Sequence, residues 1–312
     1  MTPPPLVSIV TPLHNKVEFF AETARSVFEQ TIGDFEWIVV DDASTDGSAE
    51  LLEKLGDPRL RKQFEETNRG PCSARNIGLA LAEGEWVLFL DADDRITPDH
   101  LQILIGAADC DDIVAGGWIE SDACEISDGV EKAPPPVGDL TDFAIAFAPW
   151  AVHAAILRRE HCPKWPKNLD STPGEDIAFW FHAIREAKIG VVEKSGAVYR
   201  KNTPANRSAE NRLADWYEGV SASAETNIAL AGGVDRLTAK QAENLMRLHE
   251  TYWHRARRMG DAEVERAAAA AAGKWLAETF RRKGEKPLSV HARRILGLKC
   301  FQRLADRKHN TP

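Results

Sequence analysis

The stretch VLFLDADD, Val87–Asp94, joins four apolar residues to a cluster of carboxylates. The apolar run predicts a short buried strand, and Asp91 and Asp93 follow it directly. Carboxylates this close repel one another, so they stay ionised together only if another group offsets the repulsion. Residues 94–104 resemble a helix start, with Thr97 as N-cap and Pro98 at the first helical position, and this could account for Asp94 or Asp99. Asp91 and Asp93 have no such role, and they favour a divalent cation held by hard oxygen ligands.

Around this stretch, apolar runs alternate with segments of helical periodicity. Strands are predicted at residues 6–13 and 34–42, and helices at residues 16–30 and 71–84. Apolar strands joined through helices favour an α/β fold with a mainly parallel central sheet covered on both faces. Ligands of such sheets bind beyond the carboxyl ends of the strands. Residues 34–42 and the opening stretch both end in acids, so both place carboxylates at that edge.

The rest of the chain is mixed and then helical. Strands are predicted at residues 112–120 and 152–160, with a helix at residues 174–187 and one or two short strands after it. From about Asn211 the pattern is helical throughout. We therefore predict two parts, a nucleotide-binding domain at residues 1–210 and a helical C-terminal region at residues 211–312.

Composition places the chain among globular proteins, with 43% apolar and 28% charged residues. No apolar run approaches the roughly 20 residues needed to span a bilayer. The opening MTPPPLVSIV lacks the basic region and cleavage site of a secretory signal. Five scattered cysteines without a CxxC pair predict neither a zinc site nor a disulfide framework. These features together predict a cytoplasmic protein.

The net charge of −9 is unevenly distributed. From residue 251 onward there are 15 basic and 6 acidic side chains, against 24 and 42 in the first 250 residues. In residues 290–308 apolar and basic side chains interleave, as in an amphipathic helix on an anionic membrane surface. A helix that packs on the protein with its basic side chains in solvent would show the same pattern. The acidic first part, without a stacked aromatic and basic platform, excludes nucleic acid as the expected partner.

Four blocks in order carry a family resemblance: VSIVTPLHNK, IVVDDASTDGS, NRGPCSARNIGLALAEGEWVLFLDADD and GEDIAFW. Together they resemble family 2 glycosyltransferases, an inverting group with the Rossmann-like GT-A fold. The resemblance covers roughly residues 6–210. It implies a nucleotide-sugar donor, usually UDP-linked, and a divalent cation, Mn²⁺ or Mg²⁺.

The resemblance assigns roles to the acids at the sheet edge. Asp91-Ala92-Asp93 stands at the DxD motif, where Asp93 would contact the metal and Asp91 would face the ribose or complete the metal shell. Asp42 would accept a hydrogen bond from the uracil. The alternative for Asp42 is a purely local Asx-turn before the next helix.

Further residues match the family's nucleotide-binding positions. Pro12, His14 and Asn15 correspond to the loop after the first strand, which lies along the base. Arg75 would contact the nucleotide, although an arginine in an apolar helix could simply extend to solvent. Arg207, like Arg200, falls where related enzymes often carry a basic residue near the diphosphate. For either arginine a solvated loop is the alternative.

Inversion requires a base that takes the proton of the attacking acceptor hydroxyl. The Glu175-Asp176 pair matches the family's ED motif, which assigns the base to Asp176. The alternative is a helix N-terminus that carries acids because the helix dipole favours them.

The resemblance therefore implies transfer of a hexosyl or N-acetylhexosaminyl group from a UDP-sugar to a hydroxyl of a glycan or lipid-linked acceptor. Polysaccharide or lipopolysaccharide synthesis would be the context, with peripheral association at the inner face of the membrane. A nucleotidyltransferase of similar fold is one alternative, although no glycine-rich loop with Arg or Lys follows the first strand. A non-catalytic nucleotide-sugar-binding protein is another, although all the expected acids are present.

Overall fold

The computed structural model describes residues 3–121, 129–170, 172–201 and 212–284. The chain forms two compact units, residues 1–230 and residues 231–312. Helix α8, Leu213–Leu230, follows the boundary predicted near residue 210 and is grouped with the first unit.

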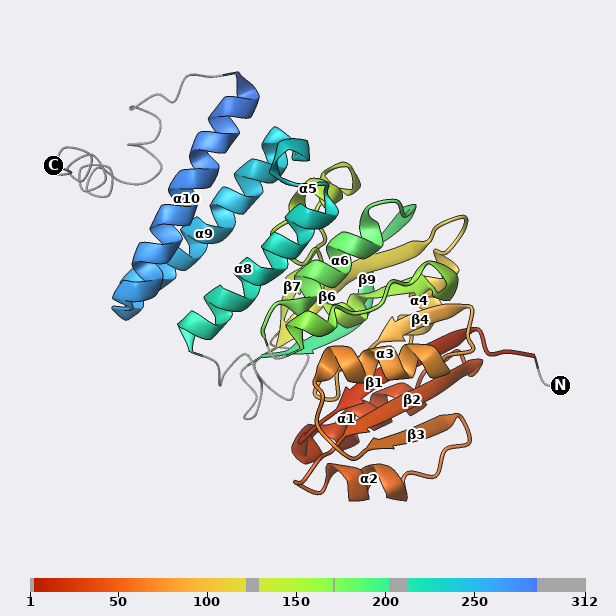
Figure 1. Ribbon diagram of the computed structural model, residues 1–312. Coiled ribbons are helices and arrows are strands. Elements are labelled where there is room, and N and C mark those ends of the chain that lie inside the picture. Colours follow the sequence, from red (N-terminus) through yellow and green to blue (C-terminus); the bar gives the residue numbers. More distant parts are fainter. Residues whose placement is uncertain (1–2, 122–128, 171, 202–211, 285–312) are drawn as a thin grey trace, which may run out of the picture. The chain divides into compact units, whose positions relative to one another are not determined.

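The first unit contains a single sheet. Its strands are β1 Val7–Leu13, β2 Phe35–Asp42, β3 Leu60–Glu65, β4 Trp86–Phe89, β5 Arg95–Ile96, β6 Ile113–Ser121, β7 Val130–Lys132, β8 Ala155–Arg158 and β9 Ile189–Arg200. Within the described residues their order is β3-β2-β1-β4-β8-β6-β9-β5, with β7 paired to β6. Figure 1 shows the neighbouring strands β3, β2 and β1. β3, β2, β1 and β4 are parallel, as predicted. β8 is antiparallel to both β4 and β6, so the sheet is mixed beyond β4.

Helices cover both faces of the sheet. They are α1 Val17–Phe28, α2 Ser48–Lys54, α3 Pro71–Leu81, α4 His100–Gly106, α5 Leu140–Ala144 and α6 Glu175–Ile184. α1, α2 and α4 pack on one face, where Phe20, Leu52 and Leu101 join Ile9 of β1 in the main core. α3 lies on the opposite face, because Gly78 approaches Val10, whose side chain alternates with that of Ile9. The two-sided cover explains why the first strands are continuous apolar runs.

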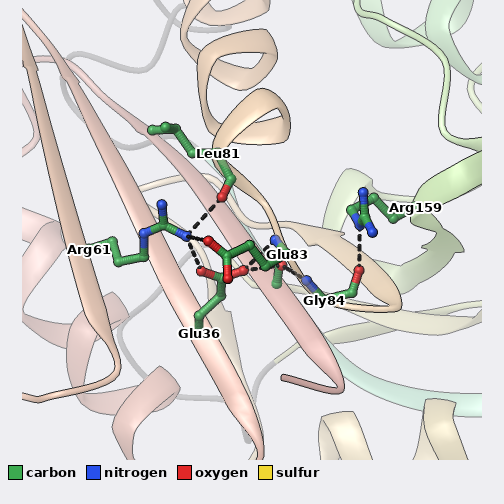
Figure 2. A network of polar contacts seen from close by, with 7 residues as sticks. Glu36, Arg61, Leu81, Glu83, Gly84 and Arg159 are labelled. Carbon is green, nitrogen blue, oxygen red and sulfur yellow. Dashed lines mark hydrogen bonds and ion pairs between the residues drawn. The ribbon is translucent and has the colours of Figure 1, made fainter. Parts of the chain in front are cut away.

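At the edge of the sheet opposite the acids, a buried carboxylate holds neighbouring strands together. Glu36, near the start of β2, accepts hydrogen bonds from Ser8 Oγ and from the backbone N–H of Glu83, both at 2.7 Å. Its other oxygen pairs with Arg61 Nη1 at 2.7 Å (Figure 2). Gly84 N–H donates to Ser8 Oγ at 2.8 Å. This network ties β1, β2, β3 and the turn before β4 together, and its groups are satisfied within the protein.

The second unit contains a helical hairpin of α9, Ala239–Met259, and α10, Ala262–Lys283. A capping box between Thr238 and Gln241 starts α9, and Gly260 ends it in the left-handed conformation. Asp261 then caps α10 by accepting from the N–H of Val264. The predicted helical character of this region is confirmed for the residues that the structure describes.

Across the described ranges, no helix has both the length and the apolar character needed to cross a bilayer. The basic segment at residues 290–308 lies outside the described residues. Both interpretations of that segment, membrane binding and packing on the protein, therefore stay predictions.

Candidate active site

A cavity of about 800 Å³ opens at the carboxyl ends of β1, β2 and β4. Nearly all of the predicted site residues line it: Pro12, His14, Asn15, Asp42, Arg75, Asp91, Ala92, Asp93 and Asp176. Arg207 lies outside the described residues. The cavity thus lies where ligands of parallel sheets bind, beyond the carboxyl ends of the strands. Asp176 reaches it from a helix far along the chain.

The loop after β1 is held in one conformation by side-chain hydrogen bonds. His14 Nδ1 donates to the carbonyl of Asp42 at 2.7 Å, which leaves Nε2 to accept from Asn15 Nδ2 at 3.1 Å and Asn68 Nδ2 at 3.0 Å. Asn15 adopts a left-handed backbone, φ 51°, and its Oδ1 accepts from Thr45 N–H at 2.8 Å. The His14 ring therefore has a fixed orientation beside the cavity.

Asp42 is a buried anchor for the loop that precedes α3. Its Oδ2 accepts from Gly70 N–H at 2.7 Å, and both oxygens accept from Arg69 N–H, at 2.9 and 3.1 Å. A carboxylate oxygen has two lone pairs, so a further donor can be accommodated. Contact with a uracil N–H stays a prediction, and the structure adds a positioning role that the sequence pattern did not indicate.

Arg75 connects two acids that are far apart in the sequence. The residue is 3% exposed, and its guanidinium donates to Asp91 Oδ1 at 2.6 Å and to Glu175 Oε1 at 3.4 Å. The group also lies over the Trp165 ring, 4.1 Å from its centroid. Burial raises the pKa of Asp91, but the charge and the hydrogen bond of Arg75, together with other nearby charges, outweigh burial, so this pKa lies below its ordinary value. The alternative of an arginine extended to solvent is wrong.

Asp93 carries the other carboxylate of the DxD motif. Its Oδ2 forms an ion pair with Lys16 Nζ at 2.7 Å, and its side chain is 13% exposed. In the described part of the chain no three His, Cys, Asp or Glu side chains group closely enough to hold a metal alone. Mg²⁺ is usually bound by one or two carboxylates together with substrate phosphates. Asp93, with Asp91 near it, fits a cation of that kind and does not fit a metal held by protein alone.

Asp94 has a different role from the helix cap predicted for it. α4 begins at His100 with Asp99 as its N-cap, and Asp94 Oδ1 instead accepts from Arg200 N–H at 2.8 Å. Asp94 Oδ2 lies 3.3 Å from Nδ1 of the fully buried His153. Burial raises the pKa of Asp94, and burial lowers the pKa of His153 to about 4. The hydrogen bond from Arg200 N–H fixes the end of the DxD turn to β9.

Arg200 does not line the cavity, and its guanidinium pairs with Glu22 of α1 at 2.7 Å. The side chain is 4% exposed, so the predicted solvated loop is wrong at this position. β9 continues to Arg200 as one strand, which carries the residue into the interior.

The two acids at the start of α6 have unlike surroundings. Glu175 forms an ion pair with Arg75 at 3.4 Å. Burial raises the pKa of Asp176 to about 7, and the neighbouring charge of Glu175 contributes in the same direction. Asp176 Oδ1 accepts from Ile177 N–H at 3.0 Å. Asp176 is thus poised to exchange a proton near neutral pH.

The cavity also contains residues that the sequence did not single out. Asp170 accepts from Ser73 N–H at 3.0 Å and Ser73 Oγ at 2.6 Å, and so caps the start of α3. Trp118, Tyr199 and Trp216 line the same cavity. No spacing signal links these aromatic residues, because they lie in β6, β9 and α8.

Comparison with known proteins shows a likeness to one family of enzymes. Residues 8–139 match the model described as glycosyl transferase family 2. This part of the chain is therefore similar to glycosyltransferase family 2. It is 40% identical over 100 residues to the putative teichuronic acid biosynthesis glycosyltransferase TuaG of Bacillus subtilis, which covers 31% of this chain and 40% of TuaG. The matches span about a third to two fifths of the length of several such relatives.

Solved structures define the architecture. S. aureus TarS 1-349 in complex with UDP-GlcNAc superposes with a TM-score of 0.60 at 21% identity, over 90% of this chain and 92% of that one. The mannosyltransferase PcManGT from Pyrobaculum calidifontis, in complex with GDP-Man and Mn²⁺, gives a TM-score of 0.52 at 18% identity, over 99% and 81%. At these identities the likeness concerns the fold, and it confirms the expected GT-A fold.

Proposed function

We propose that this chain transfers a sugar from a UDP-sugar to an acceptor hydroxyl, with inversion at the anomeric carbon. One observation carries the proposal: a single cavity contains the DxD acids, the base-side loop with Asp42, and Asp176. TarS 1-349 in complex with UDP-GlcNAc and PcManGT in complex with GDP-Man share this fold, which supports a nucleotide-sugar donor.

The donor half of the cavity is assigned to the residues after β1 and β2. His14 would lie against the uracil, and Asp42 would accept from its N–H. Because the protein itself fixes both side chains, they can bind the base without first becoming ordered. The N-terminus of α3, at Gly70 and Pro71, borders the same space. Its partial positive charge would favour the diphosphate.

Asp93, with Asp91 beside it, would hold Mn²⁺ or Mg²⁺ together with the donor's diphosphate. The cation would neutralise the charge that develops on the departing UDP. Lys16 pairs with Asp93 in the structure and so lies within reach of the same phosphates. A cation near Asp93 therefore competes with Lys16 for this carboxylate.

Asp176 would act as the general base. The acceptor oxygen forms a bond to the anomeric carbon as the bond from that carbon to the UDP oxygen breaks, and the acceptor proton passes to Asp176. A base works best when its pKa is close to the operating pH, and burial raises the pKa of Asp176 to about 7. The fixed charge of Glu175 helps to maintain this value.

The test is UDP release with Mn²⁺ across a panel of UDP-sugars, for the wild type and for Asp93→Ala and Asp176→Asn. Release with one sugar, lost in Asp93→Ala or with chelator, supports a metal-dependent transferase and identifies its donor. Asp176→Asn should bind UDP normally, as measured by calorimetry, and turn over about 10²–10⁴-fold more slowly. Pyrophosphate release would instead support a nucleotidyltransferase, and absence of UDP binding would exclude a UDP-linked donor.

Location and acceptor complete the proposal. A lipid-linked acceptor would be reached at the inner face of the membrane, and cytoplasmic placement there stays a prediction. The same panel of UDP-sugar donors distinguishes hexosyl transfer from N-acetylhexosaminyl transfer.

A further inference from the structure

The wall of the cavity away from the nucleotide loops carries three aromatic side chains. Trp118 of β6, Tyr199 of β9 and Trp216 of α8 line the cavity and are only partly buried. Other tryptophans of this unit, such as Trp37 and Trp180, are fully buried in the core. We call Trp118, Tyr199 and Trp216 the aromatic wall.

Strand register places part of this wall on one face of the sheet. β6 and β9 are parallel, with Trp118 opposite Ala197 and Glu120 opposite Tyr199. Side chains two apart on a strand, and opposite one another on paired strands, share a face. Trp118, Glu120 and Tyr199 therefore face the cavity together, as its lining confirms.

Glu120 gives the wall a polar group that is paired with two lysines. Its carboxylate lies 2.5 Å from Lys201 Nζ and 3.6 Å from Lys132 Nζ. The wall therefore combines flat rings with a paired carboxylate that accepts hydrogen bonds from hydroxyl groups. Aromatic faces suit the C–H face of a pyranose ring, and the carboxylate suits its equatorial hydroxyls.

Helix α8 is fixed to the segment that carries the proposed base. Ser223 Oγ donates to the carbonyl of Gly174 at 2.7 Å. Gly219 lies so close to Pro173 that a Cβ at this position would collide with the Pro173 carbonyl. Trp216 is almost one turn before Gly219, so its position relative to Asp176 is set by backbone packing.

We propose that the aromatic wall and Glu120 form an acceptor subsite that binds the pyranose ring of a glycan and presents its hydroxyl to Asp176. The inference rests on the proposed function for the transfer step, whereas pyranose binding is independent of it. It also gives α8, which lies beyond the residues that match the family model, a direct role in acceptor recognition.

The first experiment measures pyranoside binding without donor. Methyl β-glucopyranoside, methyl β-galactopyranoside, the N-acetylglucosaminide and short oligosaccharides are titrated into the full chain, followed by tryptophan fluorescence and ligand-observed NMR. At least one should bind saturably, with affinity at least tenfold weaker in Trp216→Ala and largely restored in Trp216→Phe. The matched control is Glu218→Ala, an exposed position of the same helix that does not line the cavity and should bind as the wild type does.

The second experiment uses the donor identified by UDP release. The pyranoside that binds should accelerate UDP release, and Trp216→Ala should raise its KM at least tenfold. Trp118→Ala and Tyr199→Ala should act in the same direction. The control Glu218→Ala should leave this KM, the UDP affinity and acceptor-free hydrolysis unchanged.

The outcomes separate the two proposals. Trp216-dependent pyranoside binding without UDP binding would uphold the subsite and reject the transferase. UDP turnover without any pyranoside binding, or binding unaffected by all three aromatic substitutions, would overturn the subsite. Acceleration only by a polyprenyl phosphate or by a peptide would overturn it as well.

Discussion

Replacing Arg75 with methionine removes the charge that joins the two acidic motifs while keeping a side chain of similar length. In the wild type, the buried guanidinium neutralises Asp91 at 2.6 Å and Glu175 at 3.4 Å and stacks on Trp165. Methionine can retain the contact with the ring. It leaves two carboxylates without the cation that both of them contact. The predicted result is a large loss of stability that is electrostatic in origin.

The size of this loss follows from burial. Removing one partner of a buried ion pair typically costs about 3–5 kcal/mol. The Asp91 side chain is 28% exposed, so water screens part of the uncompensated charge, and we expect about 3 kcal/mol. For a unit of this size that corresponds to a fall in Tm of roughly 6–12 °C. Protonation can relieve the remaining repulsion, so the deficit should shrink as the pH falls toward about 4.

Urea unfolding at pH 7 and pH 4.5, followed by circular dichroism and by calorimetry, measures the effect. Arg212→Met is the matched control, because Arg212 pairs with Asp215 at 3.2 Å but is 83% exposed, and it should change stability by less than about 0.5 kcal/mol. The double variant Arg75→Met/Asp91→Asn should recover part of the loss. A deficit of Arg75→Met below about 1 kcal/mol, or a double variant no more stable than the single one, would refute the reasoning.

Three further predictions follow from single residues. The rate constant kcat/KM should rise with pH and level off above about 7, because the pKa of Asp176 is raised to about 7 and a base must be deprotonated. Glu175→Gln should move the midpoint of this pH profile to lower pH. An unchanged midpoint would contradict the assignment of Asp176 as the base. Burial raises the pKa of Glu36, but its hydrogen bonds outweigh burial and hold this pKa below 4.5. The ionised carboxylate therefore stabilises the fold at pH 7, and this contribution is lost as the pH falls through the folded-state pKa. Glu36→Gln should be about 1–3 kcal/mol less stable at pH 7 in urea unfolding, with a smaller difference at pH 3. Gly70→Ala should lower the free energy of unfolding by about 1–3 kcal/mol in the same assay, because φ is +94° and the new Cβ would lie 2.8 Å from a carboxylate oxygen. The control Gly56→Ala places its Cβ in open space and should leave stability nearly unchanged.

The parts of the molecule that the sequence predicts are those controlled by local pattern. β1, β2 and β4 are largely apolar, and β2 and β4 lead into acids. Their parallel pairing brings Asp42, Asp91 and Asp93 to one cavity. The edge rule for parallel sheets needs no knowledge of later contacts. The order of strands β8, β6 and β9 could not be obtained in this way, since both directions of pairing are compatible with short apolar segments.

The sequence pattern also could not predict which side chains contact each other when they lie far apart in the chain. Arg75 lies on an apolar-periodic helix, and its partner Glu175 is 100 residues away. Asp94 looks like a helix cap in isolation, yet its N–H donor comes from Arg200 on β9. The aromatic wall requires the register of β6 against β9 and the placement of α8. In each case the deciding contact is set by tertiary packing, which a local window does not contain.

Two independent connections converge on the segment from Pro173 to Asp176. From the donor side, Arg75 links Asp91 of the DxD motif to Glu175. From the other side, α8 is fastened to Gly174 through Ser223. Because the same short segment carries Asp176, the proposed base is positioned against both the donor acids and the aromatic wall. A substitution that loosens either connection should therefore reduce transfer more than it reduces binding of UDP or of pyranoside alone, since only the transfer step requires both sides to be aligned at once.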